Sequence, residues 1–326
     1  MFYNISVNNP HKEDEKMIRA VPKDSKGNPY PDNKERNLIY FKVRYNHHRD
    51  LCESISREVC DVEEWAECQA VLCLPDNYSE TGEKTQLIIA CHGAGSTVCE
   101  ETTQTGGLAG VLSCVDAGYA ALDIDGAAPN GLTMGNPEHI FAMYKAYKYA
   151  VAHYNLTERV VLYGGSMGGQ TSINFACTYP SVCLALGVFF PRMNIKSFVT
   201  DDGHFCLGTW DKTTPGASGT SSHDRVVTNF HMRGGEWDAE RVCGFEPYNN
   251  RSFTNERGEK VVMPPCPIKI WHGTADTVVD PVVSEEYVRA VRRGGCYAEL
   301  RMIDGIGHYI IDSMRVELRM WFDRFI

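Results

Sequence analysis

The sequence predicts an α/β fold in which a mostly parallel central sheet is flanked by helices on both faces. Short apolar runs alternate with helical segments along most of the chain from residue 86 onward. These runs are almost wholly apolar, which is expected of strands that are buried on both faces. Residues 191–265 break the alternation and are rich in Gly, Thr, Asp and Trp. We therefore expect this stretch to be an insertion that forms a cap over the carboxyl edge of the sheet.

The expected elements follow from these patterns in chain order. Strands are expected at 38–43, 68–73, 87–91, 120–124, 160–163, 183–190, 268–271 and 298–303. Helices are expected at 107–117, 136–154, 167–178, 283–294 and 309–325. The helix at 136–154 illustrates the reasoning, because it begins at Asn136-Pro137 and its apolar residues recur every three or four positions. Residues 1–37 are rich in Pro, Asn, Lys and Asp and are expected to form a polar N-terminal arm.

The charge balance weighs against two classes of partner. The chain of 326 residues carries 32 Lys and Arg against 42 Asp and Glu, which gives a formal net charge of −10. Nucleic acids and anionic membranes bind clustered positive charge, so neither is expected as a partner. No apolar run is long enough to cross a membrane, and the N-terminus lacks the pattern of a signal peptide. A cytoplasmic location is therefore expected.

Cysteine and histidine spacing gives no sign of a metal. The 13 cysteines fit no zinc-binding spacing and form no C-x-x-C pair. They are expected to be small buried thiols, with a few disulfides in an exported protein as the alternative. His204, His223 and His231 in the insertion also lack the spacing of metal ligands. Neither a metal nor another cofactor is expected.

The segment Gly164-Gly165-Ser166-Met167-Gly168 matches the G-x-S-x-G pattern of a nucleophilic serine. It stands between a predicted strand and a predicted helix, and the pattern requires this context. Glycine two residues to either side of the serine lets strand and helix approach without Cβ clashes. The alternative is a glycine-rich turn that binds phosphate at a helix N-terminus. Because the segment lacks both G-K-[ST] and G-x-G-x-x-G, we predict that Ser166 is a nucleophile.

The acid and the base of such a site are expected to follow the nucleophile in chain order. Asp276 lies just past the strand at 268–271, and Asp280 is the competing acid. His308 lies in a glycine-containing loop after the last predicted strand and is the only histidine after His272. We predict that His308 is the general base and that Asp276 orients it. One helix and one strand do not fill the sequence between Ser166 and Asp276, which predicts an insertion independently of its composition.

Acyl transfer needs two N–H donors for the developing oxyanion. One is expected to be the backbone N–H of Met167, and the second that of Ala94 in His92-Gly93-Ala94-Gly95, with Gly93 as the alternative. The competing interpretation of this loop is a glycine turn without chemistry. Asp123 lies at the end of the strand expected at 120–124 and is expected to structure a loop, with a place for it or for Asp125 near the mouth of the site as the alternative.

Together these segments resemble the α/β-hydrolase superfamily. The resemblance covers roughly residues 68–326 apart from the insertion, and it rests on the segments 92–95, 164–168, 272–276 and 307–308. The segment 70–75 followed by 88–93 is similar to the opening of esterases and prolyl-oligopeptidase-like hydrolases. This resemblance implies an α/β-hydrolase catalytic domain over residues 38–326, which cleaves esters or peptides without a cofactor. Little chain precedes residue 68, too little for a β-propeller domain, and this favours an esterase.

The expected function is hydrolysis of a carboxylic ester through an acyl-enzyme on Ser166. The substrate is expected to be a small-molecule or glycan-linked ester with an acetyl or aromatic acyl group. Trp210, Trp237 and Arg192 are candidates for binding it, because ligand sites are mostly aromatic and apolar with few polar groups. A small peptidase or amidase is the alternative within hydrolases, and a non-catalytic binding protein on the same fold is the alternative outside them. The sequence leaves homo-oligomerisation open.

Overall fold

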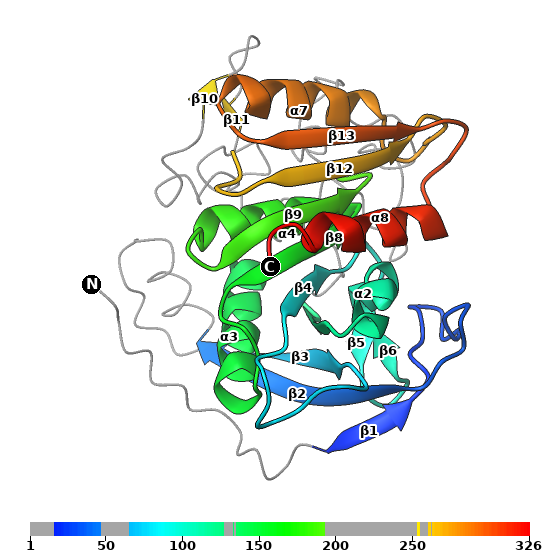
Figure 1. The fold of residues 1–326 in the computed structure, drawn as a ribbon, viewed down its shortest axis with the longest axis vertical. Helices are drawn as coiled ribbons and strands as arrows, with labels where there is room; N and C mark the ends of the chain where they lie inside the picture. Colours follow the sequence, from blue (N-terminus) through cyan, green and yellow to red (C-terminus); the bar gives the residue numbers. More distant parts are fainter. Residues whose placement is uncertain are drawn as a thin grey trace.

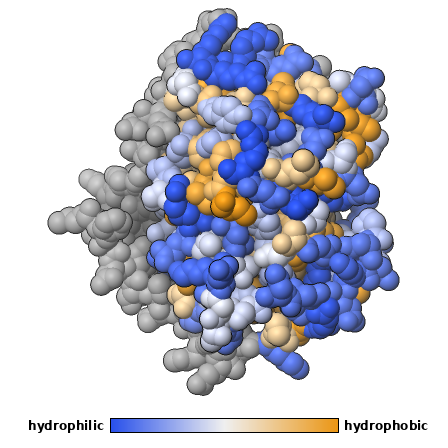
Figure 2. All heavy atoms as spheres, viewed as in Figure 1, coloured by the Kyte–Doolittle hydropathy of each residue, from blue (hydrophilic) through white to orange (hydrophobic). Residues whose placement is uncertain are grey.

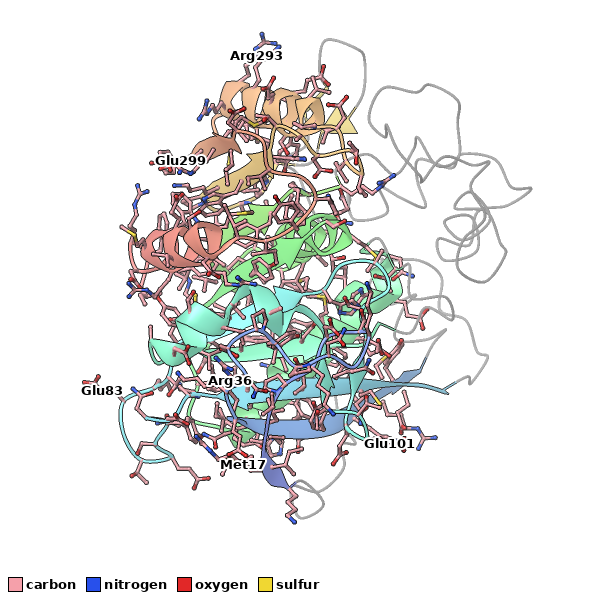
Figure 3. The ribbon with its side chains drawn as sticks, turned by 90° about the vertical axis from the view of Figure 1, so that its right-hand side faces the viewer. Met17, Arg36, Glu83, Glu101, Arg293 and Glu299 are labelled. Atoms are coloured by element: carbon pink, nitrogen blue, oxygen red, sulfur yellow. The ribbon has the colours of Figure 1, made fainter. Side chains whose placement is uncertain are left out.

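The computed structural model describes residues 16–46, 65–126, 133, 135–192, 253–254, 260–261 and 263–326. Within these ranges the main sheet has nine strands in the order β1-β2-β3-β7-β4-β8-β9-β12-β13 (Figure 1). In chain order they are β1 (Met17–Ala20), β2 (Arg36–Asn46), β3 (Trp65–Leu74), β4 (Leu87–Cys91), β7 (Ala120–Ile124), β8 (Val160–Gly165), β9 (Cys183–Phe189), β12 (Ile268–Gly273) and β13 (Ala298–Ile303). Figure 3 shows Met17 of β1 at one end of the molecule and Arg293, the last residue of α7, at the other.

The sheet is antiparallel at one side and parallel over the rest. Pairing is antiparallel from β1 through β2 and β3 to β7, and parallel from β7 through β4, β8, β9 and β12 to β13. The strand order reverses at β4, which lies between β7 and β8. In register, Cys91 at the end of β4 is opposite Gly164 of β8. The loops that follow these two strands therefore leave the sheet side by side, and such an edge is where ligands bind in open α/β sheets.

Helices cover both faces because both faces of the strands are apolar. They are α2 (Leu112–Asp116), α3 (Pro137–His153), α4 (Met167–Thr178), α7 (Val282–Arg293) and α8 (Asp312–Phe322), with a 3₁₀ turn η2 at Gly106–Gly110. In β4, Ile89 packs into the core that contains α3, α4 and α7, whereas Ile88 packs into the core that contains α2 and α8. This alternation gives two cores, one on each face of the sheet.

Every strand expected from the sequence is present, and the structure adds pairings of two or four residues. These are β1, the pair β5 (Val98–Cys99) with β6 (Gln104–Thr105), and the pair β10 (Phe253–Thr254) with β11 (Lys260–Val261). The helix expected at 107–117 is divided into η2 and α2, and Gly110 fits there because a Cβ would overlap the ring of Tyr163. The helix expected at 309–325 begins at Asp312, because Ile311 has extended backbone angles.

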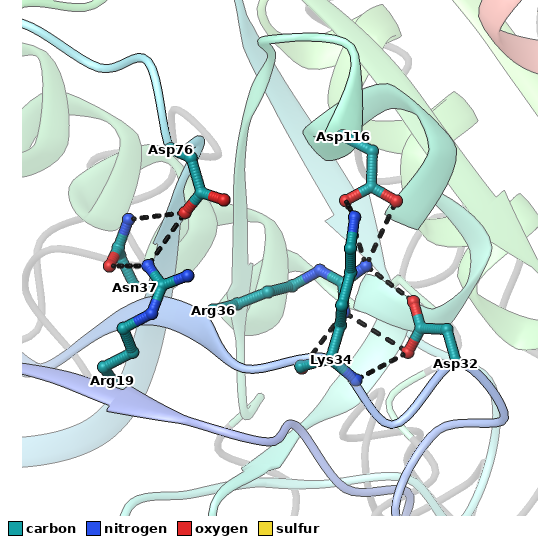
Figure 4. Close-up of polar contacts among 7 residues, drawn as sticks. All are labelled: Arg19, Asp32, Lys34, Arg36, Asn37, Asp76 and Asp116. Carbon is teal, nitrogen blue, oxygen red and sulfur yellow. Dashed lines mark hydrogen bonds and ion pairs between the residues drawn. The ribbon is translucent and has the colours of Figure 1, made fainter.

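The described part of the predicted polar arm is fixed to the sheet. Residues 17–20 form β1, and Arg19 makes an ion pair of 2.8 Å with Asp76 (Figure 4). The Arg36 side chain is buried at the start of β2 and binds Asp32 at 2.7 Å and Asp116 at 3.3 Å. This cluster ties the lead-in to the end of α2. It lies at the amino end of β7, on the opposite edge of the sheet from the candidate site described below.

None of the helices within the described ranges is long and apolar enough to cross a membrane. On the face shown in Figure 2, apolar side chains are interspersed among hydrophilic ones. Most of the cysteines within the described ranges are buried. Most of the predicted cap, residues 193–252, lies outside the described residues.

Candidate active site

Ser166 lies on a strained turn between β8 and α4. Its backbone angles are φ 54° and ψ −120°, in a region that residues other than glycine rarely occupy. Three backbone hydrogen bonds hold the turn: Ser166 N–H donates to the Phe189 carbonyl at 2.9 Å, and the Ser166 carbonyl accepts from Gly169 and Arg192 at 3.0 Å each. The turn therefore sets the serine at the carboxyl edge of the sheet, where the G-x-S-x-G pattern predicts it.

Two glycines are required for this turn by close backbone approach. A Cβ on Gly164 would overlap the carbonyl of Gly168, and a Cβ on Gly168 would overlap the carbonyl oxygen of Cys91 at the end of β4. Both obstacles are backbone atoms, which cannot rotate away as a flexible side chain can. The glycines thus let α4 begin directly against β4 and β8.

Replacing Gly168 with alanine is therefore expected to destabilise the protein by about 3 kcal/mol, the upper range for overpacking. Urea denaturation monitored by circular dichroism would measure this loss. Gly93→Ala is the matched control, because the atoms nearest to its Cβ would be 3.5 and 3.7 Å away, at ordinary contact distance. Equal stability of the two variants would contradict the steric account of the turn.

His308 and Asp276 form a hydrogen-bonded pair. His308 Nδ1 lies 2.7 Å from Asp276 Oδ2, and the Asp276 side chain is fully buried. The other carboxylate oxygen, Oδ1, accepts the backbone N–H groups of Val278 at 2.8 Å and Val279 at 2.9 Å. Asp280, the competing acid, instead accepts the Val282 N–H at the start of α7. The structure thus brings Asp276 rather than Asp280 to the imidazole.

A second histidine, which the sequence analysis did not single out, also contacts Asp276. His272 in β12 is fully buried, and its Nε2 lies 3.2 Å from Asp276 Oδ2. Burial raises the pKa of the Asp276 carboxyl group, but hydrogen bonds from His272, His308 and the Val279 backbone hold it well below its ordinary value. Asp276 is therefore ionised throughout the neutral pH range. The available signal in the sequence was a histidine at a strand end four residues before the predicted acid.

Phe190 connects the serine turn to the histidine loop. It follows β9, its ring centroid is 4.4 Å from that of His308, and its neighbour Phe189 accepts the Ser166 N–H. The described residues include no hydrogen bond between Ser166 Oγ and His308. Such contacts are often long in ligand-free enzymes and shorten in the substrate complex.

The loop predicted to hold the oxyanion lies against the serine. A Cβ on Gly93 would be 3.7 Å from the Cβ of Ser166, and Gly95 has a φ of 79° that lets the loop turn. Met167 is the first residue of α4 and is fully buried, and its N–H has no carbonyl partner within the helix. Ala94 lies between the two loop glycines. Met167 thus directly follows Ser166, and Gly93, the neighbour of Ala94, lies against it.

A buried hydrogen bond between His92 and Asp123 attaches this loop to β7. His92 Nδ1 lies 3.0 Å from Asp123 Oδ2, and both side chains are 2% exposed. The same carboxylate accepts the N–H groups of Gly107 at 2.6 Å and Ile124 at 2.8 Å. Burial lowers the pKa of His92, but the Asp123 carboxylate more than offsets this and leaves the pKa above its ordinary value. Asp123 therefore structures the loop and does not line the mouth of the site.

Arg192 is the candidate binding residue that the structure describes. It is buried, its N–H donates to the Ser166 carbonyl, and its Nη1 lies 3.5 Å from the carbonyl of Val278, beside Asp276. Trp210 and Trp237 lie outside the described residues, as do His204, His223 and His231 in the insertion. The described residues contain no group of three or more His, Cys, Asp or Glu side chains that could hold a metal ion.

The chain is similar in structure to known proteins, although it matches none of them in sequence. No protein-family model matches the chain, and no curated protein matches it in sequence. Among solved structures, Candida antarctica lipase A in its closed state has a TM-score of 0.59 at 12% identity, covering 95% of this chain and 80% of the lipase. A putative dipeptidyl aminopeptidase IV from Bacteroides ovatus has a TM-score of 0.56 at 13% identity, covering 91% of this chain and 36% of that one. Pyrococcus horikoshii acylaminoacyl peptidase has a TM-score of 0.54 at 13% identity, covering 88% and 42%.

The chain has the α/β-hydrolase fold. Its α/β-hydrolase sheet carries the candidate residues on four loops, which follow β4, β8, β12 and β13 at one edge of the sheet. The chain spans less than half of the length of either peptidase, whereas it spans most of the lipase.

Proposed function

We propose that this protein is a serine hydrolase that cleaves carboxylic esters, with Ser166 as nucleophile, His308 as general base and Asp276 as the acid that orients the base. The observation that carries the proposal is the buried Asp276–His308 pair at the same sheet edge as the strained Ser166 turn. Strained turns and buried ionised carboxylates are costly, and they concentrate at catalytic sites.

The proposed mechanism uses side chains and backbone donors alone. His308 takes the proton from the Ser166 hydroxyl as its oxygen attacks the acyl carbonyl. Asp276 accepts from Nδ1 and so leaves Nε2 as the nitrogen that faces the serine, and its charge stabilises the imidazolium. The N–H groups of Met167 and Ala94 stabilise the oxyanion. His308 then protonates the leaving alcohol. It next takes a proton from the water that attacks the acyl-enzyme and returns that proton to the Ser166 oxygen as the acid leaves.

The preference for an ester over an amide is supported by the likeness to Candida antarctica lipase A, of which the chain covers 80% at a TM-score of 0.59. The proposed substrate is a small-molecule or glycan-linked ester with an acetyl or aromatic acyl group. Arg192 is proposed to contact a polar part of it, because the residue is buried directly beside Ser166. A small peptidase or amidase is the second candidate, since both peptidases share the fold.

Purified protein is expected to hydrolyse p-nitrophenyl acetate and p-nitrophenyl esters of aromatic acids, and to turn over aminoacyl-p-nitroanilides at least about 100-fold more slowly in kcat/KM. Release of p-nitrophenol or p-nitroaniline, monitored by absorbance, measures both rates. The reverse ranking would establish the amidase. Folded protein that processes neither substrate and resists a fluorophosphonate would instead point to a non-catalytic binding protein.

A further inference from the structure

The fully buried His272 is not used in the proposed mechanism, although it contacts the proposed acid. Its Nε2 lies 3.2 Å from Asp276 Oδ2 and 3.1 Å from the carbonyl oxygen of Val279. Its Nδ1 lies 2.7 Å from the hydroxyl of Ser284, which is also fully buried, in the first turn of α7. A buried histidine with three polar partners has no freedom to reorient, so its orientation is fixed.

The partners determine which nitrogen of His272 carries the proton. The Val279 carbonyl and the ionised Asp276 carboxylate can only accept hydrogen bonds, so Nε2 must be the protonated nitrogen. In the neutral ring Nδ1 is then an acceptor, and the Ser284 hydroxyl donates to it. Donation therefore runs in one direction, from Ser284 to His272 and from His272 to Asp276.

Both carboxylate oxygens of Asp276 consequently have hydrogen-bond donors other than His308. Oδ1 accepts two backbone N–H groups, from Val278 and Val279. Oδ2 lies between two imidazoles, that of His272 at 3.2 Å and that of His308 at 2.7 Å. The donor from His272 occupies one side of Oδ2, which leaves the remaining lone pair of that oxygen for His308.

We propose that His272 is a positioning residue of the active site, which Ser284 holds in its Nε2–H form so that it fixes Asp276 Oδ2 against His308. The kinetic consequences rest on the proposed function, whereas the hydrogen-bond geometry does not. Orienting residues behind a catalytic histidine determine its tautomer and basicity, as outer-shell partners do for histidines that bind metals.

The direction of the pH effect follows from the charges around His308. Asp276 is the carboxylate in contact with His308, and His272 contacts the same carboxylate oxygen. The Arg192 guanidinium contacts the Val278 carbonyl, two residues after Asp276. Phe190 presents an apolar ring, and Asp304 of the same loop binds Thr274. Without the His272 donor, the backbone N–H groups still hold Oδ1, and more of the negative charge on Oδ2 faces His308. The imidazolium form is then favoured, so activity at acid pH must fall.

His272→Leu, which removes both nitrogens at similar volume, is expected to lower kcat about 10- to 100-fold, the range for loss of one hydrogen bond to a charged group. KM is expected to stay within about twofold, and the acid limb of the kcat/KM profile to move to higher pH by about half a unit or more. His272→Gln, whose amide N–H can reach Asp276, is expected to recover most of kcat. Ser284→Ala is expected to move the acid limb of the kcat/KM profile in the same direction by a smaller amount. Ser113→Ala, which loses the 2.9 Å hydrogen bond that the Ser113 hydroxyl donates to the Arg315 carbonyl of α8, is the matched control and is expected to show no shift.

The low-field proton NMR signal of the Asp276–His308 hydrogen bond provides a readout that needs no catalysis. The signal is expected to move in His272→Leu and Ser284→Ala and to stay in place in Ser113→Ala. Unchanged signals and pH profiles in folded His272→Leu and Ser284→Ala would overturn the proposal. If wild-type protein proved inactive, the proposed function would fail, and the NMR comparison would still decide whether His272 positions the pair. If His272→Leu did not fold, Ser284→Ala and His272→Gln would decide it.

Discussion

Ser166→Ala is expected to lower kcat for ester hydrolysis about 10⁶-fold, to the level left by oxyanion donors and binding alone. The reason is that the acyl-enzyme cannot form without the hydroxyl oxygen, whereas the remaining site is unchanged. Alanine adopts the same strained φ as serine at this turn, so stability is expected to stay within about 0.5 kcal/mol of wild type. Initial rates with p-nitrophenyl acetate and a thermal melt would measure both quantities.

Ser172→Ala is the matched control for this variant. Ser172 is a buried serine of α4, the helix that follows Ser166, and its hydroxyl donates to the Gly169 carbonyl at 2.9 Å. Its loss is expected to cost about 1 kcal/mol of stability and little activity. A Ser166→Ala protein that kept more than a few per cent of the wild-type rate would show that another residue is the nucleophile.

Asp276→Asn is expected to lower kcat about 10⁴-fold at neutral pH, because an amide N–H facing Nδ1 would favour the wrong tautomer of His308. The substitution also removes the negative charge that stabilises the imidazolium in the transition state. The low pKa of the Asp276 carboxyl group means that the wild-type enzyme keeps this charge across the whole neutral range. A pH profile of kcat/KM between mildly acid and mildly alkaline pH would measure the loss.

Asp280→Asn is the paired control, because both carboxylates lie in the loop before α7 and each accepts a backbone N–H from the residue two positions on. It removes the competing acid that the sequence left open, and it is expected to retain nearly all activity. A greater loss in Asp280→Asn than in Asp276→Asn would reverse the assignment. Comparable losses in both would indicate that the loop as a whole, and not one carboxylate, supports His308.

The sequence predicted the strands, the helices and the order of the candidate residues because each depends on local patterns. Apolar runs between turn residues identified β4, β8 and β12. The glycines around Ser166 stand where the backbones of strand and helix approach so closely that only glycine fits. The choice of Asp276 over Asp280 also followed from distance past the strand end. In each case, neighbours within a few residues determine the conformation.

The features that the sequence did not reveal depend on contacts between distant segments. The position of β1 is determined by pairing with β2, and its four residues carry too little pattern to identify alone. His272 and Ser284 meet across a strand and a helix, and His92 meets Asp123 across two neighbouring strands. A polar side chain that will be buried against another has no local signature in the sequence. These contacts therefore became visible only in the folded chain.

The most direct test of the central claim is to treat the folded protein with a fluorophosphonate and to locate the adduct by peptide mass spectrometry. The account predicts one adduct, on Ser166, with labelling that slows strongly in Asp276→Asn and His308→Ala because the serine is no longer activated. An adduct on a different residue, or labelling of Ser166 at equal rates in wild type and both variants, would contradict it.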